Sequence, residues 1–175
     1  MTLAKAKLYD VEHISSENHE NHIPFMFNPT ELEFSRTMDW DSGAGASTEE
    51  GDPLTSFKRP NPVTLTIKNI ILDTYEQQES VIPHLRKFMQ AVEFMKSGDE
   101  KGKRPPIYLF TWGNNAYLRC YVSTLTFSLT LFLPDGTPVR ALIPSLVLTQ
   151  GDIATPKGSQ LPPSVNSSTR LLFSR

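Results

Sequence analysis

Two long segments joined by a short turn constrain this chain more than any other feature. The segments cover residues 117–132 and 139–149, and Pro134-Asp135-Gly136 lies between them. Aspartate and glycine accept the backbone angles of a tight turn. In the first segment apolar and polar residues alternate as in a strand, and this alternation slips near Ser123-Thr124. We therefore expect an antiparallel hairpin of two long strands, the first with a bulge or bend.

Shorter strand patterns occupy most of the remaining chain. They predict strands over 4–11, from 32 toward Trp40 with an end near Asp41, over 63–72 and over 107–112. The apolar run 23–27 stops at a turn predicted for Asn28-Pro29-Thr30, because proline lacks a donor and restricts the residue before it. The sequence therefore predicts a mostly β protein.

One segment has the periodicity of a helix instead. Its apolar residues recur at steps of one, three and four over roughly 77–96, with Pro83 in the first turns, where proline is tolerated. These residues are Val81, Ile82, Leu85, Phe88, Met89, Val92 and Met95. One helix beside many strands indicates the α+β class.

The segments rich in glycine, proline and polar residues are expected to be loops. They are 13–22, a long loop at 41–62, and 97–106. Beyond Gln150 the composition cannot bury much surface, so 151–175 is expected to be an extended tail. Residues 1–150 are then expected to form one domain, since no internal repeat or linker is evident.

Composition excludes several classes of partner. The 175 residues have a formal charge of -2, which gives no global reason to expect nucleic acid. No apolar run approaches the roughly 20 residues that span a bilayer, and the N-terminus lacks a signal-peptide pattern, so no membrane insertion is expected. The single cysteine, Cys120, cannot form an internal disulfide, which favours synthesis in a reducing cytoplasm.

The sequence offers little catalytic chemistry. His13, His19 and His22 do not have the spacing of a zinc site, and solvated loop histidines are the favoured interpretation. His84 and Cys120 have no activating sequence context, and the short basic run near Lys101 adjoins two acidic residues. No nucleophile elbow, phosphate loop, zinc helix or dinucleotide fingerprint occurs. We therefore expect no catalytic, cofactor-binding or metal-binding residues and no enzyme activity, although a hydrolase using a histidine is a remote alternative.

Three stretches together resemble the tube proteins of contractile injection systems and phage tails. They are Phe25-Met26-Phe27-Asn28-Pro29-Thr30-Glu31-Leu32-Glu33-Phe34-Ser35-Arg36, Phe110-Thr111-Trp112-Gly113, and Leu133-Pro134-Asp135-Gly136-Thr137-Pro138-Val139-Arg140-Ala141. The resemblance covers roughly residues 3–150. It implies a split barrel of two antiparallel sheets, one flanking helix, and a hexameric ring around a channel.

The resemblance also implies partners and a position in a particle. Candidate interface residues are Asn28, Pro29, Trp40, Lys58, Arg59 and Arg140. Expected partners are further copies of the chain and inner-tube, baseplate and spike proteins, assembled in a bacterial cytoplasm. Similar proteins carry a peptidoglycan-binding LysM module, for which 151–175 is too short. A tube initiator or baseplate adaptor is expected first. A repeating tube subunit, a cap-side adaptor, or a small peptidoglycan- or protein-binding module using Trp40 or Trp112 are the alternatives.

Overall fold

A computed structural model describes residues 3–11, 22–47, 53–94 and 104–151, with the backbone alone at 40–47 and 53–59. Its elements are β1 (Ala6–Asp10), β2 (Ile23–Pro24), β3 (Glu33–Ser35), β4 (Met38–Ser47), β5 (Pro53–Pro60), β6 (Thr64–Asp73), α1 (Ile82–Ala91), β7 (Tyr108–Trp112), β8 (Asn115–Phe132) and β9 (Pro138–Gln150). The mostly β fold with one helix is confirmed.

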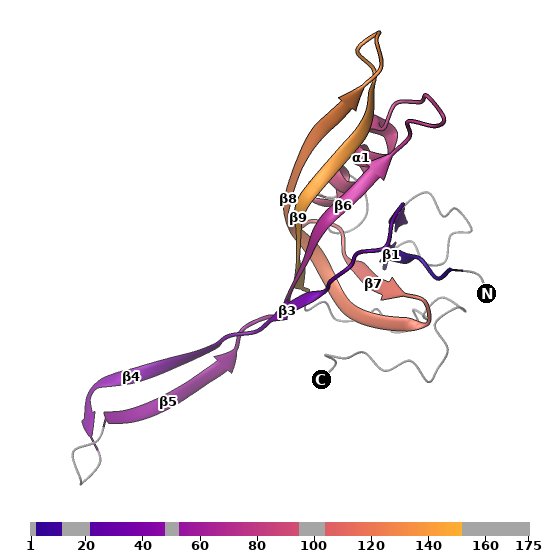
Figure 1. Cartoon of the computed structure of the whole chain (residues 1–175). Helices are drawn as coiled ribbons and strands as arrows, with labels where there is room; N and C mark the ends of the chain where they lie inside the picture. Colours follow the sequence, from indigo (N-terminus) through magenta and orange to yellow (C-terminus); the bar gives the residue numbers. More distant parts are fainter. Residues whose placement is uncertain (1–2, 12–21, 48–52, 95–103, 152–175) are drawn as a thin grey trace.

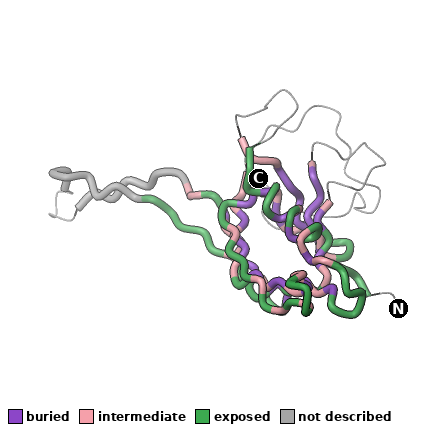
Figure 2. Tube along the Cα trace, turned by 90° about the horizontal axis from the view of Figure 1, so that it is seen from above, coloured by how far each residue is buried: buried purple, intermediate pink, exposed green. Residues whose placement is uncertain are grey.

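One antiparallel sheet of seven strands forms the body, in the order β2-β1-β7-β8-β9-β6-β3. The sheet curls into a half-barrel around its core (Figures 1 and 2). The strands expected to form two barrel sheets thus belong to one continuous sheet, because β8 is long enough to pair with β7 at one end and with β9 along its length. A second sheet contains only β4 and β5.

The predicted hairpin is the centre of this sheet. β8 and β9 pair from Cys120 opposite Gln150 to Phe132 opposite Pro138. The register shifts between Val122 and Thr124, which confirms the expected slip near Ser123-Thr124. This bulge lets β8 bend between the part that pairs with both β7 and β9 and the part beyond Val122, here called upper β8, that pairs with β9 alone.

A second irregularity lies where β6 faces β9. Asn69 has a positive φ of 54° and comes between Lys68, paired with Ser145, and Ile70, paired with Ile143. Burial changes phase there: Leu65 and Ile67 are buried before Asn69, and Ile70 and Leu72 after it. Asparagine tolerates this left-handed conformation better than most residues. The strand predicted over 63–72 is therefore confirmed, and its buried positions shift by one residue beyond Lys68.

The helix packs on the concave side of the sheet. Leu85, Phe88 and Ala91 are buried, and Phe88 meets Phe25 edge to face with ring centroids 5.8 Å apart. Phe25 also contacts Phe110, at 6.0 Å. The helix is shorter than the expected span 77–96. Residues 75–78 form a turn instead, and Val92 and Glu93 donate to carbonyls three residues earlier, closing the helix.

The long loop expected at 41–62 was wrong in large part. Residues Met38–Ser47 and Pro53–Pro60 form an antiparallel ribbon, here called the arm, which projects from the body (Figure 1). The predicted strand end near Asp41 was wrong for the same reason. Glycine and serine bury little surface, yet a ribbon pairs its backbone groups without a core. Most of the predicted loops at 13–22 and 97–106 and nearly all of the tail 151–175 lie outside the described residues.

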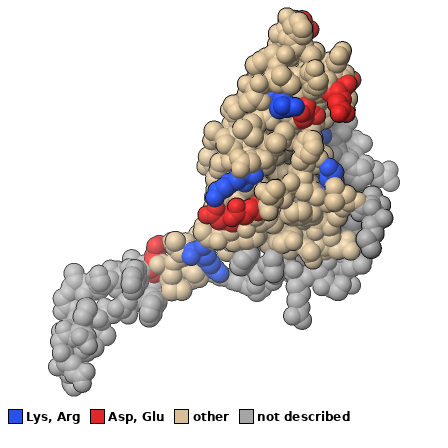
Figure 3. All heavy atoms as spheres, viewed as in Figure 1, with Lys and Arg blue, Asp and Glu red and all other residues tan. Residues whose placement is uncertain are grey.

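The strands β6, β9 and upper β8 pack on α1 with one face, and no described element covers the other face. We call the side turned away from α1 the bare face. Figure 3 views this side, and few Lys, Arg, Asp or Glu side chains occur over these strands. No described element covers this surface of the sheet.

Candidate assembly surface

The β8–β9 hairpin ends in the turn that the sequence predicted. The Gly136 N–H donates to the Leu133 carbonyl at 2.9 Å, and the Leu133 N–H donates to the Thr137 carbonyl at 2.9 Å. The Asp135 carboxylate accepts from the Thr137 N–H and hydroxyl, both at 2.9 Å, and these bonds hold the pKa of Asp135 below its usual range. Gly136 has a φ of +87°, which explains the glycine. The turn is thus held by hydrogen bonds among its own residues.

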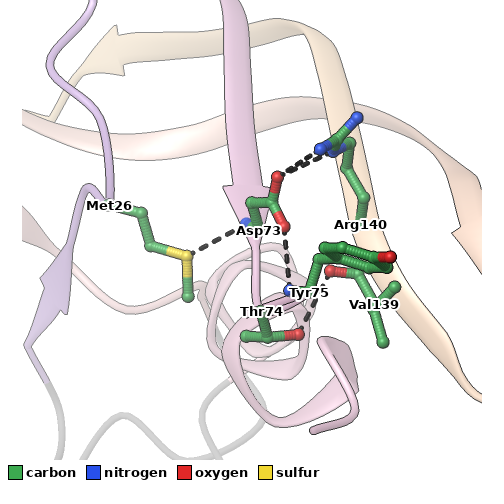
Figure 4. A network of polar contacts seen from close by, with 6 residues as sticks. All are labelled: Met26, Asp73, Thr74, Tyr75, Val139 and Arg140. Carbon is green, nitrogen blue, oxygen red and sulfur yellow. Dashed lines mark hydrogen bonds and ion pairs between the residues drawn. The ribbon is translucent and has the colours of Figure 1, made fainter. Parts of the chain in front are cut away.

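Arg140, one of the expected interface residues, pairs within its own subunit (Figure 4). Its Nε donates to Asp73 Oδ2 at 2.8 Å, and its Nη2 lies 2.6 Å from the same oxygen. The Tyr75 N–H donates to Asp73 Oδ1 at 2.9 Å. This N–H and then the Arg140 guanidinium hold the pKa of Asp73 below its usual range, against the opposing effect of burial.

Two further contacts join the same region. The Asp73 N–H donates to Met26 Sδ at 3.2 Å, which ties the segment before β3 to the end of β6. The Thr74 hydroxyl donates to the Val139 carbonyl at 3.1 Å (Figure 4), and the Thr74 N–H donates to the same carbonyl at 2.9 Å. Arg140 therefore helps to fasten the end of β6 to β9, and its side chain is still 43% exposed.

Asn28 and Pro29, also expected at an interface, have contacts within the subunit. Asn28 Oδ1 accepts from the Ala6 N–H at 2.9 Å, and its Nδ2 donates to the Ala4 carbonyl at 2.8 Å. The amide thus acts as a strand partner for β1. Pro29 is buried, and the chain bends at Met26 and Phe27, just before the turn predicted for Asn28-Pro29-Thr30, and at Thr30 within it.

Trp40, Lys58 and Arg59 all lie in the arm. Trp40 is in β4 opposite Phe57, and Lys58 and Arg59 are in β5. The fold thus brings these three predicted residues to one projecting ribbon and separates them from Asn28 and Arg140. Whether any of the six contacts another subunit stays a prediction.

An open strand edge was missed by the sequence argument. β7 pairs with β8 only as far as Cys120, whereas β9 pairs with β8 up to Phe132. From Tyr121 to Phe132, one edge of β8 therefore faces no strand among the described residues. Phe127 and Phe132 on this stretch are 39% and 52% exposed. No local sequence signal reveals an edge, because it depends on where the neighbouring strand stops.

The residues that the sequence analysis considered for catalysis, metal binding or ligand binding are placed as follows by the fold. Cys120 is fully buried, and burial raises the pKa of its thiol to about 12, so it remains protonated at neutral pH. His22 Nδ1 accepts from the Asp10 N–H at 3.3 Å, and its ring packs on Tyr9. His84 is exposed on α1, while His13 and His19 lie outside the described residues. Trp112, considered as a ligand platform, is half-buried and donates to the Ala4 carbonyl at 3.2 Å.

The described residues lack two further features. They contain no group of three or more His, Cys, Asp or Glu side chains placed to hold a metal ion. No helix within the described ranges has the length and apolar character needed to cross a membrane.

Comparison with known proteins places the chain in one family. No curated protein matches the chain. The family described as contractile injection system tube protein matches residues 2–153. Because that match covers most of the chain, the protein belongs to the contractile injection system tube protein family, whose members are structural components of multi-subunit particles.

Proposed function

We propose that the chain is a ring-forming structural subunit of a contractile injection system and has no catalytic role. Six copies close into a ring around a channel, and the ring joins the inner tube to the baseplate and spike proteins. Assembly takes place in a bacterial cytoplasm. The family supports membership of such a particle, while ring number and position are part of the proposal.

The observation that carries the proposal is the open edge of β8. An unpaired edge of this length, with Phe127 and Phe132 exposed beside it, would promote uncontrolled aggregation in a monomer. Pairing with a neighbouring copy satisfies these backbone groups, and closure into a ring leaves no copy with a free edge. The projecting arm supports contacts with a further layer of the particle, as a connecting subunit requires.

Electron microscopy tests the proposal directly. Purified protein or native particles should show sixfold rings containing this chain, and a monomer within an intact particle would refute ring formation. Labelling the chain in particles should place one ring near the baseplate. Labelling along the whole tube or at the far end would instead favour a repeating tube subunit or a cap-side adaptor.

A matched pair of variants tests the role of the β8 edge. Phe127→Lys places a charge at that edge, and Met89→Lys makes the same change on α1 at an equal exposure of 39%. We expect Phe127→Lys to reduce ring formation and Met89→Lys to leave it unchanged, with both variants folded by circular dichroism. Equal ring formation by both would show that the β8 edge is not the interface.

A further inference from the structure

The open edge of β8, residues 121–132, pairs with no described strand on the side away from β9. Phe127 alternates with Leu125 and Leu129, which pack on the core, so its ring lies on the core side of the sheet. It is nevertheless 39% exposed. A further strand at this edge would pair the backbone groups of β8 and would also cover Phe127.

The chain beyond β9 leaves the sheet where this edge begins. The Gly151 N–H donates to the Arg119 carbonyl of β8 at 3.1 Å. A Cβ at Gly151 would lie 3.1 Å from Ile107 Cδ1, just before β7, and 3.6 Å from Tyr121 Cδ1, on β8. Gly151 therefore lies against the point at which the pairing of β7 with β8 stops and the open edge starts.

The sequence after Gly151 has the length to return to this edge. Residues 152–163 contain three prolines, whereas residues 164–175 contain none. Each stretch has twelve residues, as has the open edge at 121–132. The first stretch can span at most about 40 Å, which is about the length of the edge, so the second can reach any part of the edge in its own subunit.

The side chains of residues 164–175 also alternate as an edge strand requires. In an extended conformation one side carries apolar residues, namely Val165, Leu171 and Phe173. All but one of the residues on the other side are polar, namely Ser164, Asn166, Ser168, Arg170 and Ser174. This pattern matches β8, where Leu125 and Phe127 lie on the core side and Thr124 and Thr126 are exposed on the other.

We propose that residues 164–175 add as a strand to the open β8 edge of their own subunit before assembly, and that a neighbouring copy displaces them when the ring closes. The displacement rests on the proposed function, whereas pairing within the free subunit does not. A short connection keeps the segment at a local concentration in the millimolar range, far above that of a second copy in dilute solution. Since one edge cannot pair with two strands, the segment protects the free subunit from aggregation and slows ring closure.

A pair of matched variants tests this pairing in the full chain. Ser167→Pro combined with Ser168→Pro removes an N–H that faces β8 in either register, because alternate residues of an edge strand point their N–H groups at the partner. The control combines Ser159→Pro with Gln160→Pro, in the stretch that already contains prolines. Hydrogen–deuterium exchange is measured by mass spectrometry at concentrations where each protein is monomeric. A peptide covering 121–132 reports on the edge, and one covering 139–149 is the internal reference.

We expect the 121–132 peptide to exchange about tenfold faster in the test variant than in wild type, with the control at the wild-type rate and the reference peptide unchanged. The test variant should also form rings or aggregates severalfold faster. Equal exchange in all three proteins would overturn the inference. Protection in wild type that rises with protein concentration would overturn it too, because the segment would then pair with another copy.

The same samples separate this inference from the proposed function. Normal ring formation with equal exchange in all three proteins would refute the pairing of residues 164–175 and leave ring formation standing. Faster exchange in the test variant with no rings in any sample would support the pairing and refute ring formation.

Discussion

Replacing Asn28 by alanine separates a role within the subunit from a role between subunits. Asn28 was expected at an interface, yet its amide makes two hydrogen bonds to the backbone around β1. If these bonds are its main function, Asn28→Ala destabilises the isolated chain and changes assembly only through that loss. If Asn28 binds a neighbour, the variant assembles poorly at normal stability.

The two hydrogen bonds contribute differently to the free energy of unfolding because their backbone partners differ in burial. Ala6 is fully buried, so loss of the acceptor leaves its N–H unsatisfied, which costs about 1–3 kcal/mol. The Ala4 carbonyl belongs to an exposed residue and still accepts from Trp112 Nε1, so loss of that donor costs about 0.5 kcal/mol. Asn28→Ala should therefore lower the free energy of unfolding by about 1.5–3.5 kcal/mol, equivalent to roughly 3–14 °C in Tm.

Equilibrium unfolding in urea at a concentration where the protein is monomeric measures this change. Asn28→Asp keeps the acceptor and loses only the donor, so its loss should be smaller than that of Asn28→Ala. Thr30→Ala, at an exposed neighbouring position, should change stability by less than about 0.5 kcal/mol. Wild-type stability of Asn28→Ala would contradict a stabilising role of this amide within the subunit, and loss of rings in the same sample would then assign Asn28 to an interface.

Three further predictions concern the body of the subunit. The pKa of Asp73 is held below its usual range, so its stabilising contribution is present above a pH of about 4 and lost as the pH falls through the lowered value. Between pH 7 and pH 2 the free energy of unfolding in urea should therefore fall less for Asp73→Asn than for wild type. An equal fall in both would contradict this. Asn69 has a positive φ, so Asn69→Val should lower the free energy of unfolding by about 1–2 kcal/mol, whereas Asn69→Gly should stay near wild type in thermal unfolding. An equal effect of both variants would rule out backbone strain at this position. Thr111 Oγ1 is buried without a hydrogen-bond partner, so Thr111→Val should raise the free energy of unfolding by about 1 kcal/mol. A clear loss of stability in calorimetry would show that the hydroxyl does form a hydrogen bond.

Local patterns in the sequence were sufficient for the strands, the helix and the hairpin turn. Alternation identified β6 and the β8–β9 pair, and the slip at Ser123-Thr124 identified the bulge, because these signals depend on residues that are near in the chain. The arm was mistaken for a loop because glycine, serine and proline at 41–62 carry no apolar alternation. A two-stranded ribbon outside the core does not require that alternation, since its backbone bonds define it.

The sequence by itself determined that this protein is a strand-rich member of a tube family, with Pro134-Asp135-Gly136 joining its two longest strands. Only the tertiary structure decided how Asn28 and Arg140 are used, since their partners Ala6 and Asp73 are distant in the chain. The open edge of β8 also came from the structure alone. It exists because β7 ends its pairing at Cys120, and where one strand stops beside another depends on the packing of the whole sheet.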